Sequence, residues 1–159
     1  KKRLNVRLRG ETARGKHDDI VYTKAVLAEV GRIACIDARR TFCAGYSRGA
    51  RFCSHLASDI PGVFAAIAPV AGLRFPSPCH ASRPLPVIAF HGLEDRTNAF
   101  KGGGPPYWNE SVPEVVSRWV QFNGCNRSES QRLSSAVAVE RHLECDAGAD
   151  VVLVRVGDG

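Results

Sequence analysis

The sequence predicts an α/β fold with a mostly parallel sheet flanked by helices, on the basis of three observations. Short apolar runs suited to strands alternate along the chain with segments of helical periodicity. The apolar runs are uninterrupted, which is typical of strands buried on both faces of a parallel sheet. The chain of 159 residues is also long enough to form one domain with a hydrophobic core.

Three segments have the pattern of helices. From about residue 19 to 33, apolar residues recur at steps of three and four after Asp18 and Asp19. A second helical stripe follows residue 47 and ends before Pro61. A third helix is predicted over residues 112–122, with Pro113 in its first turn.

Five segments have the composition of strands, at residues 41–45, 64–70, 85–90, 136–145 and 151–156. Between the third strand and the third helix lies a loop rich in glycine and proline, residues 98–109. Lys101 precedes three glycines there, but no G-K-[ST] closes the segment, so a phosphate-binding loop is not predicted.

The positive charge is concentrated at the start of the chain. Residues 1–16 contain seven basic side chains and one acidic side chain, which equals the whole net charge of +6. Such an arm could bind nucleic acid or an acidic polymer. Because it lacks aromatic residues for stacking and its like charges repel, we expect residues 1–17 to be a solvated, disordered leader, with no nucleic-acid partner. No apolar run approaches the roughly 20 residues of a membrane span, so no membrane partner is expected.

Six cysteines are present, and no C-x-x-C pair occurs among them. Zinc binding and thioredoxin chemistry are therefore not predicted, and no metal or cofactor is expected. An even number of cysteines without metal-binding spacing suits disulfides in an oxidising compartment, although buried free thiols would give the same count. The spacing does not decide how the cysteines pair.

The stretch Gly45-Tyr46-Ser47-Arg48-Gly49 has the pattern G-x-S-x-G. It follows a predicted strand and precedes a predicted helix, which is the context of a nucleophile elbow. In such a bend the serine hydroxyl stands clear of the sheet, and Gly45 and Gly49 are expected to avoid clashes in the crowded turn. The backbone N–H of Arg48, at the start of the helix, is the expected oxyanion donor.

A serine nucleophile needs an imidazole base and a carboxylate that orients the imidazole. In α/β folds of this kind the acid follows a later strand. The predicted strand at 85–90 is followed by His91-Gly92-Leu93-Glu94-Asp95. Both Glu94 and Asp95 are therefore candidates for the acid.

Several stretches together resemble a known family. They are residues 18–20, 36–40, 44–49, 64–72 and 86–92 with Asp95, followed by Tyr107-Trp108, the helix at 112–119 and residues 123–125. From about residue 18 to 159 the chain resembles the secreted α/β-hydrolase esterases of the polyhydroxybutyrate depolymerase and feruloyl esterase (LpqC-like) family. The resemblance implies that residues 18–159 are a partial catalytic domain, the C-terminal part of an α/β-hydrolase fold truncated at both ends.

The resemblance also implies roles for particular residues. Ser47 is the expected nucleophile, and the family pattern selects Asp95 over Glu94 as the acid. A disulfide between Cys125 and Cys145 is implied by cysteines at these places in similar members. His91 is expected to have a structural role in the His-Gly turn.

The catalytic histidine of the family follows a glycine-rich turn after the last strand. Residues 154–159 are similar to the approach to that turn, so this histidine is expected beyond Gly159. His55 is expected to point away from the elbow, and His142 is expected to face solvent. Neither these two nor His17 and His80 are expected to act as the base.

The resemblance implies a secreted serine esterase that forms an acyl-Ser47 intermediate and acts on feruloyl esters of plant cell-wall xylan. Polyhydroxyalkanoate depolymerisation is the alternative substrate class. Tyr107 and Trp108 are expected either to form an aromatic wall for the substrate or to pack against the core. A truncated product without a base would be non-catalytic, and this chain by itself is expected to be nearly inactive. The oligomeric state is not predicted.

Overall fold

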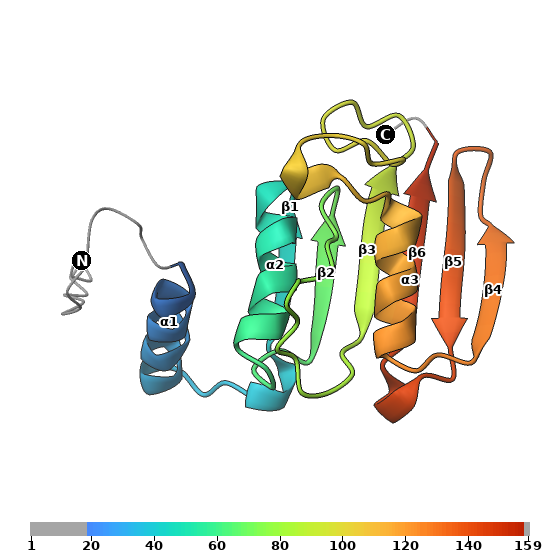
Figure 1. The fold of residues 1–159 in the computed structure, drawn as a ribbon. Helices are drawn as coiled ribbons and strands as arrows, with labels where there is room; N and C mark the ends of the chain where they lie inside the picture. Colours follow the sequence, from blue (N-terminus) through green and yellow to red (C-terminus); the bar gives the residue numbers. More distant parts are fainter. Residues whose placement is uncertain (1–18, 158–159) are drawn as a thin grey trace. The chain divides into compact units, whose positions relative to one another are not determined.

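The computed structural model describes residues 19–157 of the chain (Figure 1). The leader predicted at residues 1–17 lies outside the described residues. The chain divides into two units, Lys1–Ile36 and Asp37–Gly159. The described part of the first unit contains one helix, and the second unit contains the sheet.

Helix α1 spans Asp19–Ile33, which confirms the helix predicted from about 19 to 33. Asp19 lies in its first turn and Arg32 in its last, so both charges oppose the helix dipole favourably. Arg32 pairs with Glu29 at the surface. No residue of α1 is buried, and the side chains of Tyr22 and Ile33 are exposed.

Six strands of the second unit form one mixed sheet in the order β1-β2-β3-β6-β5-β4. The first four strands of that order are parallel, whereas β5 runs antiparallel to both β6 and β4. This arrangement is compatible with the predicted α/β fold. The bounds are β1 Phe42–Tyr46, β2 Ala66–Val70, β3 Val87–Gly92, β4 Arg127–Arg132, β5 Val137–Leu143 and β6 Val151–Val156.

The sequence does not predict strand β4. All six of its residues are exposed, and its sequence, Arg-Ser-Glu-Ser-Gln-Arg, contains no apolar side chain. It lies at the end of the sheet and pairs with β5 over its whole length. Backbone hydrogen bonds to β5, rather than burial of side chains, therefore hold β4 in the sheet, and its charges suit an edge strand.

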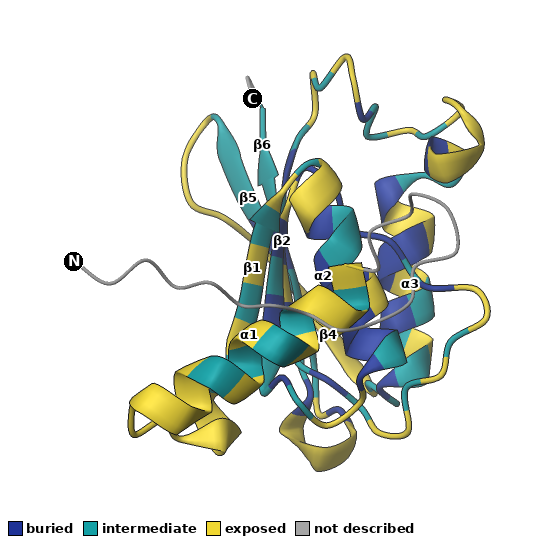
Figure 2. Cartoon of the chain, turned by 90° about the vertical axis from the view of Figure 1, so that its left-hand side faces the viewer, coloured by how far each residue is buried: buried dark blue, intermediate teal, exposed yellow. Residues whose placement is uncertain are grey.

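Helices α2 (Arg48–Asp59) and α3 (Val112–Phe122) lie on the same face of the sheet, with α2 over β1 and β2 and α3 over β3 and β6 (Figures 1 and 2). Their buried sides enclose a core with Ile67, Val87 and Leu153 of the sheet. Three short 3₁₀ helices, η1 (Ala38–Arg40), η2 (Pro106–Trp108) and η3 (Asp146–Gly148), lie in connecting segments. None of the helices within residues 19–157 has the length and apolar character needed to cross a membrane.

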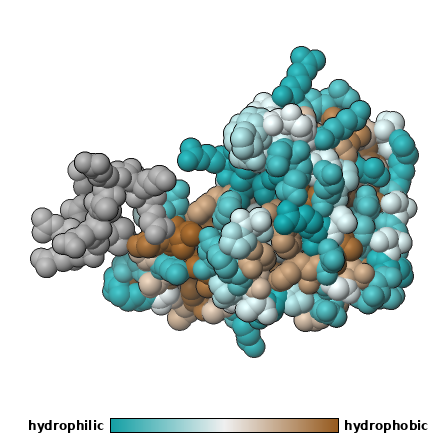
Figure 3. Space-filling view, in the orientation of Figure 1, coloured by the Kyte–Doolittle hydropathy of each residue, from teal (hydrophilic) through white to brown (hydrophobic). Residues whose placement is uncertain are grey.

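The prediction that the strands are buried on both faces is wrong for β1. Exposed and half-buried residues alternate along this strand, and Tyr46 keeps 72% of its surface exposed. Phe42 on the same strand and Ile88 on β3 are also exposed. The cause is that α2 and α3 cover one face of the sheet, whereas these side chains point to the other face. In Figure 3, the outer side of the helices is mainly hydrophilic.

Two disulfides tie the second unit together. One joins Cys43 of β1 to Cys53 of α2, so it holds the two elements on either side of Ser47. The other joins Cys125, after α3, to Cys145, after β5, which is the pair that the resemblance implied. Cys35 is an exposed free thiol and Cys79 is a half-exposed one, so neither of the unpaired cysteines is the buried free thiol that the sequence left open.

Candidate active site

Ser47 occupies a strained turn between β1 and α2. Its backbone has φ 52° and ψ −113°, a region that side chains rarely adopt, so surrounding contacts must hold it there. The Ser47 N–H donates to Val70 O of β2 at 2.8 Å, and the Ser47 carbonyl accepts from Arg51 N at 3.1 Å. The hydroxyl makes no capping bond to α2. The helix therefore does not use the hydroxyl, and the side chain remains half-exposed beside the sheet.

The glycines of the turn differ in what they permit. A Cβ on Gly45 would lie 2.5 Å from Gly49 O and 2.8 Å from Ala50 N, whereas a Cβ on Gly49 would have no neighbour within 4 Å. The expected clash is therefore present at Gly45, and the same expectation for Gly49 is wrong because its Cβ direction is open. Gly72, which lies outside the G-x-S-x-G motif, is also required: its Cβ would overlap Ser47 O and lie 2.6 Å from the Ala50 side chain.

A pocket of about 430 Å³ opens beside Ser47. It lies at the carboxyl ends of the four parallel strands, where ligands bind in open α/β sheets. Ser47 and Asp95 both line it, so the structure brings the predicted nucleophile and the predicted acid to one cavity. The other lining residues are Tyr46, Val70, Ala71, Phe90, His91, Gly92, Thr97, Asn98 and Val156.

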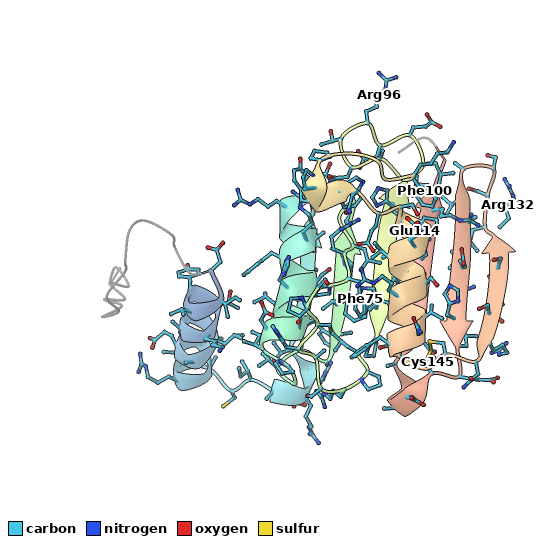
Figure 4. All side chains as sticks on the ribbon, viewed as in Figure 1. Phe75, Arg96, Phe100, Glu114, Arg132 and Cys145 are labelled. Carbon is cyan, nitrogen blue, oxygen red and sulfur yellow. A yellow bond between two sulfur atoms is a disulfide. The ribbon has the colours of Figure 1, made fainter. Side chains whose placement is uncertain are left out.

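Asp95 is fixed in the loop that follows β3. Its Oδ1 accepts hydrogen bonds from the backbone N–H groups of Thr97 and Asn98, both at 2.8 Å. Its other oxygen, Oδ2, lies 3.8 Å from Nε2 of His91. The neighbouring residues point elsewhere: Glu94 is exposed outside the pocket, and Arg96 projects outward from the loop (Figure 4).

His91 is a buried residue that lines this pocket. Its Nε2–H donates to Asn98 O at 2.7 Å, and its ring stacks on Trp108 with centroids 5.6 Å apart. Burial lowers the pKa of His91, and the Asn98 carbonyl and Asp95 oppose that change only in part. The imidazole is therefore neutral, with its Nε2 proton committed to a backbone carbonyl.

The other described histidines do not line the pocket. His55 is exposed on α2, and His80 is exposed beside Asp59. His142 is not solvent-facing as predicted: it is buried, with Nδ1 2.8 Å from Ser128 Oγ and Nε2 3.1 Å from Glu140. The prediction was wrong because the adjacent charged residue on a strand points to the opposite face, while the charged residue two positions away, Glu140, pairs with the buried ring. His17 lies outside the described residues.

The two aromatic residues of the glycine- and proline-rich loop, Tyr107 and Trp108, differ in burial. Trp108 has no exposed surface, donates its indole N–H to Ala99 O at 2.8 Å and lies under the Arg74 guanidinium at 4.7 Å. Trp108 therefore packs in the core and cannot form the substrate wall. Tyr107 is 55% exposed, and the Arg51 guanidinium lies 4.8 Å from its ring centroid. Of the two residues, Tyr107 alone has an exposed ring, and it is not among the residues that line the pocket beside Ser47.

The start of α2 is suited to receive negative charge. Arg48 is its first residue, so the Arg48 N–H has no intrahelical acceptor and lies where the helix dipole is positive. Within residues 19–157, no three His, Cys, Asp or Glu side chains are grouped so that they could hold a metal ion. The groups that line the pocket beside the start of α2 include the hydroxyl of Ser47 and the carboxylate of Asp95.

Comparison with known proteins gives names that agree with this site. No protein-family model matches the chain. The chain is similar to feruloyl esterase B of Piromyces equi, with 26% identity over 153 residues that cover 89% of this chain and 28% of that protein. It is also 24% identical to the probable feruloyl esterase C of Aspergillus niger over 118 residues, 74% of this chain and 40% of that protein. A shorter match of 77 residues, 30% identical, covers 48% of the chain and 12% of the bifunctional acetylxylan esterase/xylanase XynS20E of Neocallimastix patriciarum.

The chain spans less than half the length of each of these curated relatives. All three of these similar proteins are named as esterases.

Proposed function

We propose that this chain is the nucleophile-bearing part of a serine esterase catalytic domain with an α/β-hydrolase fold. The observation that carries the proposal is that Ser47, on a positive-φ turn between strand and helix, shares one pocket with Asp95 at the carboxyl edge of the parallel strands. A strained serine at the carboxyl edge is the arrangement expected of a nucleophile elbow. The similarity to named esterases supports the same class of reaction.

In the proposed reaction Ser47 Oγ attacks the ester carbonyl carbon while a histidine accepts the hydroxyl proton. The Arg48 N–H donates to the oxygen that becomes negative in the tetrahedral intermediate. The intermediate collapses, the histidine returns the proton to the leaving alcohol, and the acyl group remains on Ser47. Water then attacks the acyl-serine by the same route in reverse and releases the carboxylic acid.

The base in this mechanism is assigned to a histidine outside the described residues, as the resemblance implies. His91 lines the pocket, but its Nε2 is bonded to Asn98 O, and burial keeps the ring neutral. Asp95 keeps one oxygen free of backbone bonds, and that oxygen is available to an incoming imidazole N–H. The proposal therefore gives Asp95 the role of orienting the base.

Feruloyl esters of plant cell-wall xylan are the proposed substrate. Two of the named relatives are feruloyl esterases and a third is an acetylxylan esterase/xylanase. The exposed Tyr107 ring offers a flat apolar surface to a phenolic acid. The two disulfides favour a secreted protein, since disulfides persist in oxidising compartments. Polyhydroxyalkanoate esters are the second candidate substrate.

The proposed nucleophile is tested with a fluorophosphonate probe on the full-length natural protein and its Ser47→Ala variant. We expect labelling of the wild type and none of Ser47→Ala, together with a loss of esterase activity of at least about 10³-fold. Ser128→Ala is the matched control, because Ser128 Oγ contacts His142 and does not line the pocket beside Ser47. Labelling that persists in Ser47→Ala would reject Ser47.

The substrate is tested separately by comparing two model esters with the same enzyme preparation. Release of ferulate from methyl ferulate is expected to exceed hydrolysis of a short hydroxybutyrate oligomer. The opposite ranking would favour the depolymerase. Hydrolysis of neither ester by the full-length protein, with no probe labelling, would support a non-catalytic product.

A further inference from the structure

Asn98 is a buried polar residue that links the parts of the candidate site. It lies in the loop after β3 and keeps 2% of its surface exposed. Its backbone N–H donates to Asp95 Oδ1 at 2.8 Å, and its backbone carbonyl accepts from His91 Nε2 at 2.7 Å. Its side chain reaches Ser47 on the other side of the pocket. One residue therefore connects the proposed acid to the proposed nucleophile.

The orientation of the Asn98 amide is determined by its partners. Its Oδ1 accepts from Arg51 Nη1 at 3.1 Å, while its Nδ2 donates to Ala71 O at 2.8 Å and to Ser47 Oγ at 3.4 Å. A flipped amide would place the NH₂ group against the Arg51 donor and the oxygen against the Ala71 carbonyl. Both contacts would be repulsive, so the NH₂ group is the part of the amide that faces Ser47.

This orientation constrains the hydroxyl of Ser47. Because Ser47 Oγ accepts a hydrogen from Asn98, its own O–H must point to a different acceptor. The bond of 3.4 Å is long, as hydrogen bonds in unliganded sites often are. A hydrogen bond to a charged oxygen is shorter and stronger than one to a neutral oxygen, so we expect this bond to shorten if negative charge develops on Oγ. Asn98 thus favours the proton leaving toward a base and stabilises the oxygen that remains.

We propose that Asn98 is a positioning residue for the esterase reaction, held by Arg51, which directs the Ser47 proton toward the general base. The inference rests on the proposed function, because it assigns a role at the same nucleophile. It adds two residues, Asn98 and Arg51, that the G-x-S-x-G motif and the acid motif do not contain. Asn98 acts through Ser47 and Asp95 rather than on the substrate.

The isosteric substitution Asn98→Asp tests the proposal. A carboxylate oxygen would replace the NH₂ group next to Ser47 Oγ and Ala71 O, and it would accept the serine proton in place of the base. We expect the rate constant of fluorophosphonate labelling, and kcat for ester hydrolysis, to fall by about 10- to 100-fold, with KM changed less than about twofold. A purely structural role would instead lower the thermal midpoint and change both kinetic constants.

The pH profile gives a second readout of the same variant. At lower pH the introduced carboxyl group gains a proton and can donate again. The ratio of Asn98→Asp activity to wild-type activity is therefore expected to rise as pH falls from 8 toward about 5, near the upper range of carboxyl titration. A structural defect predicts a ratio that stays constant or falls.

Two further variants keep the test decisive. Asn123→Asp is the matched control, because Asn123 is also buried, its side chain bonds backbone groups of Leu85 and Ala149, and it does not line the pocket beside Ser47. It is expected to lower stability with an unchanged pH ratio. Arg51→Met removes the donor that orients the Asn98 amide. Because Arg51 is half-exposed on α2, we expect the fold to be retained and kcat to fall several-fold.

The outcomes separate this inference from the proposed function. If Ser47→Ala abolishes labelling while Asn98→Asp and Arg51→Met label at the wild-type rate, the role of Asn98 is overturned and the nucleophile stands. If Ser47→Ala still labels, the proposed function fails, and the role of Asn98 fails with it. Reduced kcat in both Asn98→Asp and Arg51→Met, with the altered pH ratio in Asn98→Asp, supports the inference.

Discussion

At the scale of single residues, the two glycines of the G-x-S-x-G pattern are equivalent in sequence but not in the folded turn. Gly45 is the next-to-last residue of β1 and lies against the first turn of α2, where a Cβ would meet backbone atoms of Gly49 and Ala50 that cannot yield. Gly49 lies within α2, and its Cβ direction is open. The close approach of strand to helix that exposes Ser47 therefore depends on Gly45 and not on Gly49.

This difference predicts opposite effects of two alanine substitutions. Gly45→Ala is expected to lower the free energy of unfolding by about 3 kcal/mol, as strong overpacking does, and to abolish probe labelling. Gly49→Ala is expected to raise it by about 0.5 kcal/mol, because alanine restricts the unfolded chain and favours the helix. Urea denaturation of the two variants measures both effects. Equal destabilisation by the two substitutions would contradict the steric difference.

At the scale of elements, α3 shows how local sequence fixes a helix start. Ser111 Oγ accepts from Glu114 N at 3.3 Å, and Glu114 Oε2 accepts from Ser111 N at 2.7 Å, which together form a capping box. The hydrogen bonds from the Ser111 side chain and backbone lower the pKa of Glu114. The stabilisation that comes from the bonds to the Glu114 carboxylate is therefore fully present above the ordinary glutamate pKa and is lost as pH falls through the lowered value, whereas the bond from Glu114 N to Ser111 Oγ does not titrate.

Ser111→Ala is expected to lower the free energy of unfolding by about 1 kcal/mol at pH 7. The cause is the loss of one acceptor for the free N–H groups at the start of α3. Ser117→Ala is the control, since Ser117 is exposed in the middle of the same helix, where alanine is at least as favourable. The expected effect is seen as a shift of the urea midpoint. Equal midpoints for the two variants would show that the box contributes nothing.

Elements with a strong local signal could be predicted from the sequence. The helices at 19–33 and 112–122 match α1 and α3, because caps and apolar periodicity mark their ends. The second strand begins at Ala66 rather than at 64, and β4 escapes prediction because it is held by pairing with β5 alone. Local patterns report burial and caps, whereas the pairing of a polar edge strand depends on its neighbour.

The candidate site divides in the same way. Ser47 and Asp95 are predictable because short motifs contain them, and the structure brings both to one pocket. Asn98 and Gly72 could not be predicted. The Asn98 side chain acts through contacts with residues 27 and 51 positions away. Gly72 is required because the backbone of Ser47 passes close to it. The stretch Asp95-Arg96-Thr97-Asn98 contains one signal that could have been used. An aspartate side chain often accepts hydrogen bonds from backbone N–H groups two or three residues later, and such a turn would place Asn98 close to Asp95.

At the scale of the whole second unit, covalent links reinforce a core that is covered by helices on one face of the sheet. The link between Cys43 and Cys53 holds β1 against α2, and the link between Cys125 and Cys145 holds the end of α3 near the end of β5. Exposed Phe42 and Tyr46 show that the opposite face of β1 adds little burial in the described residues. Stability of this unit is therefore expected to depend on the oxidised state.

Loop closure predicts how much each link contributes, because a disulfide restricts the unfolded chain more when it closes a longer loop. The pair 125–145 spans 20 residues and the pair 43–53 spans 10, so removing the first is expected to cost about 3 kcal/mol and the second about 0.6 kcal/mol less. Double alanine variants of each pair, measured by urea denaturation without reductant, test the order. Cys79→Ala is the control, because Cys79 is a free, half-exposed thiol and its removal breaks no link.

Alkylation of the native wild type should modify two cysteines, Cys35 and Cys79, and reduction in denaturant should expose the other four. A third adduct on the native protein, or equal stability of all three variants, would show that at least one link does not constrain the folded chain in solution.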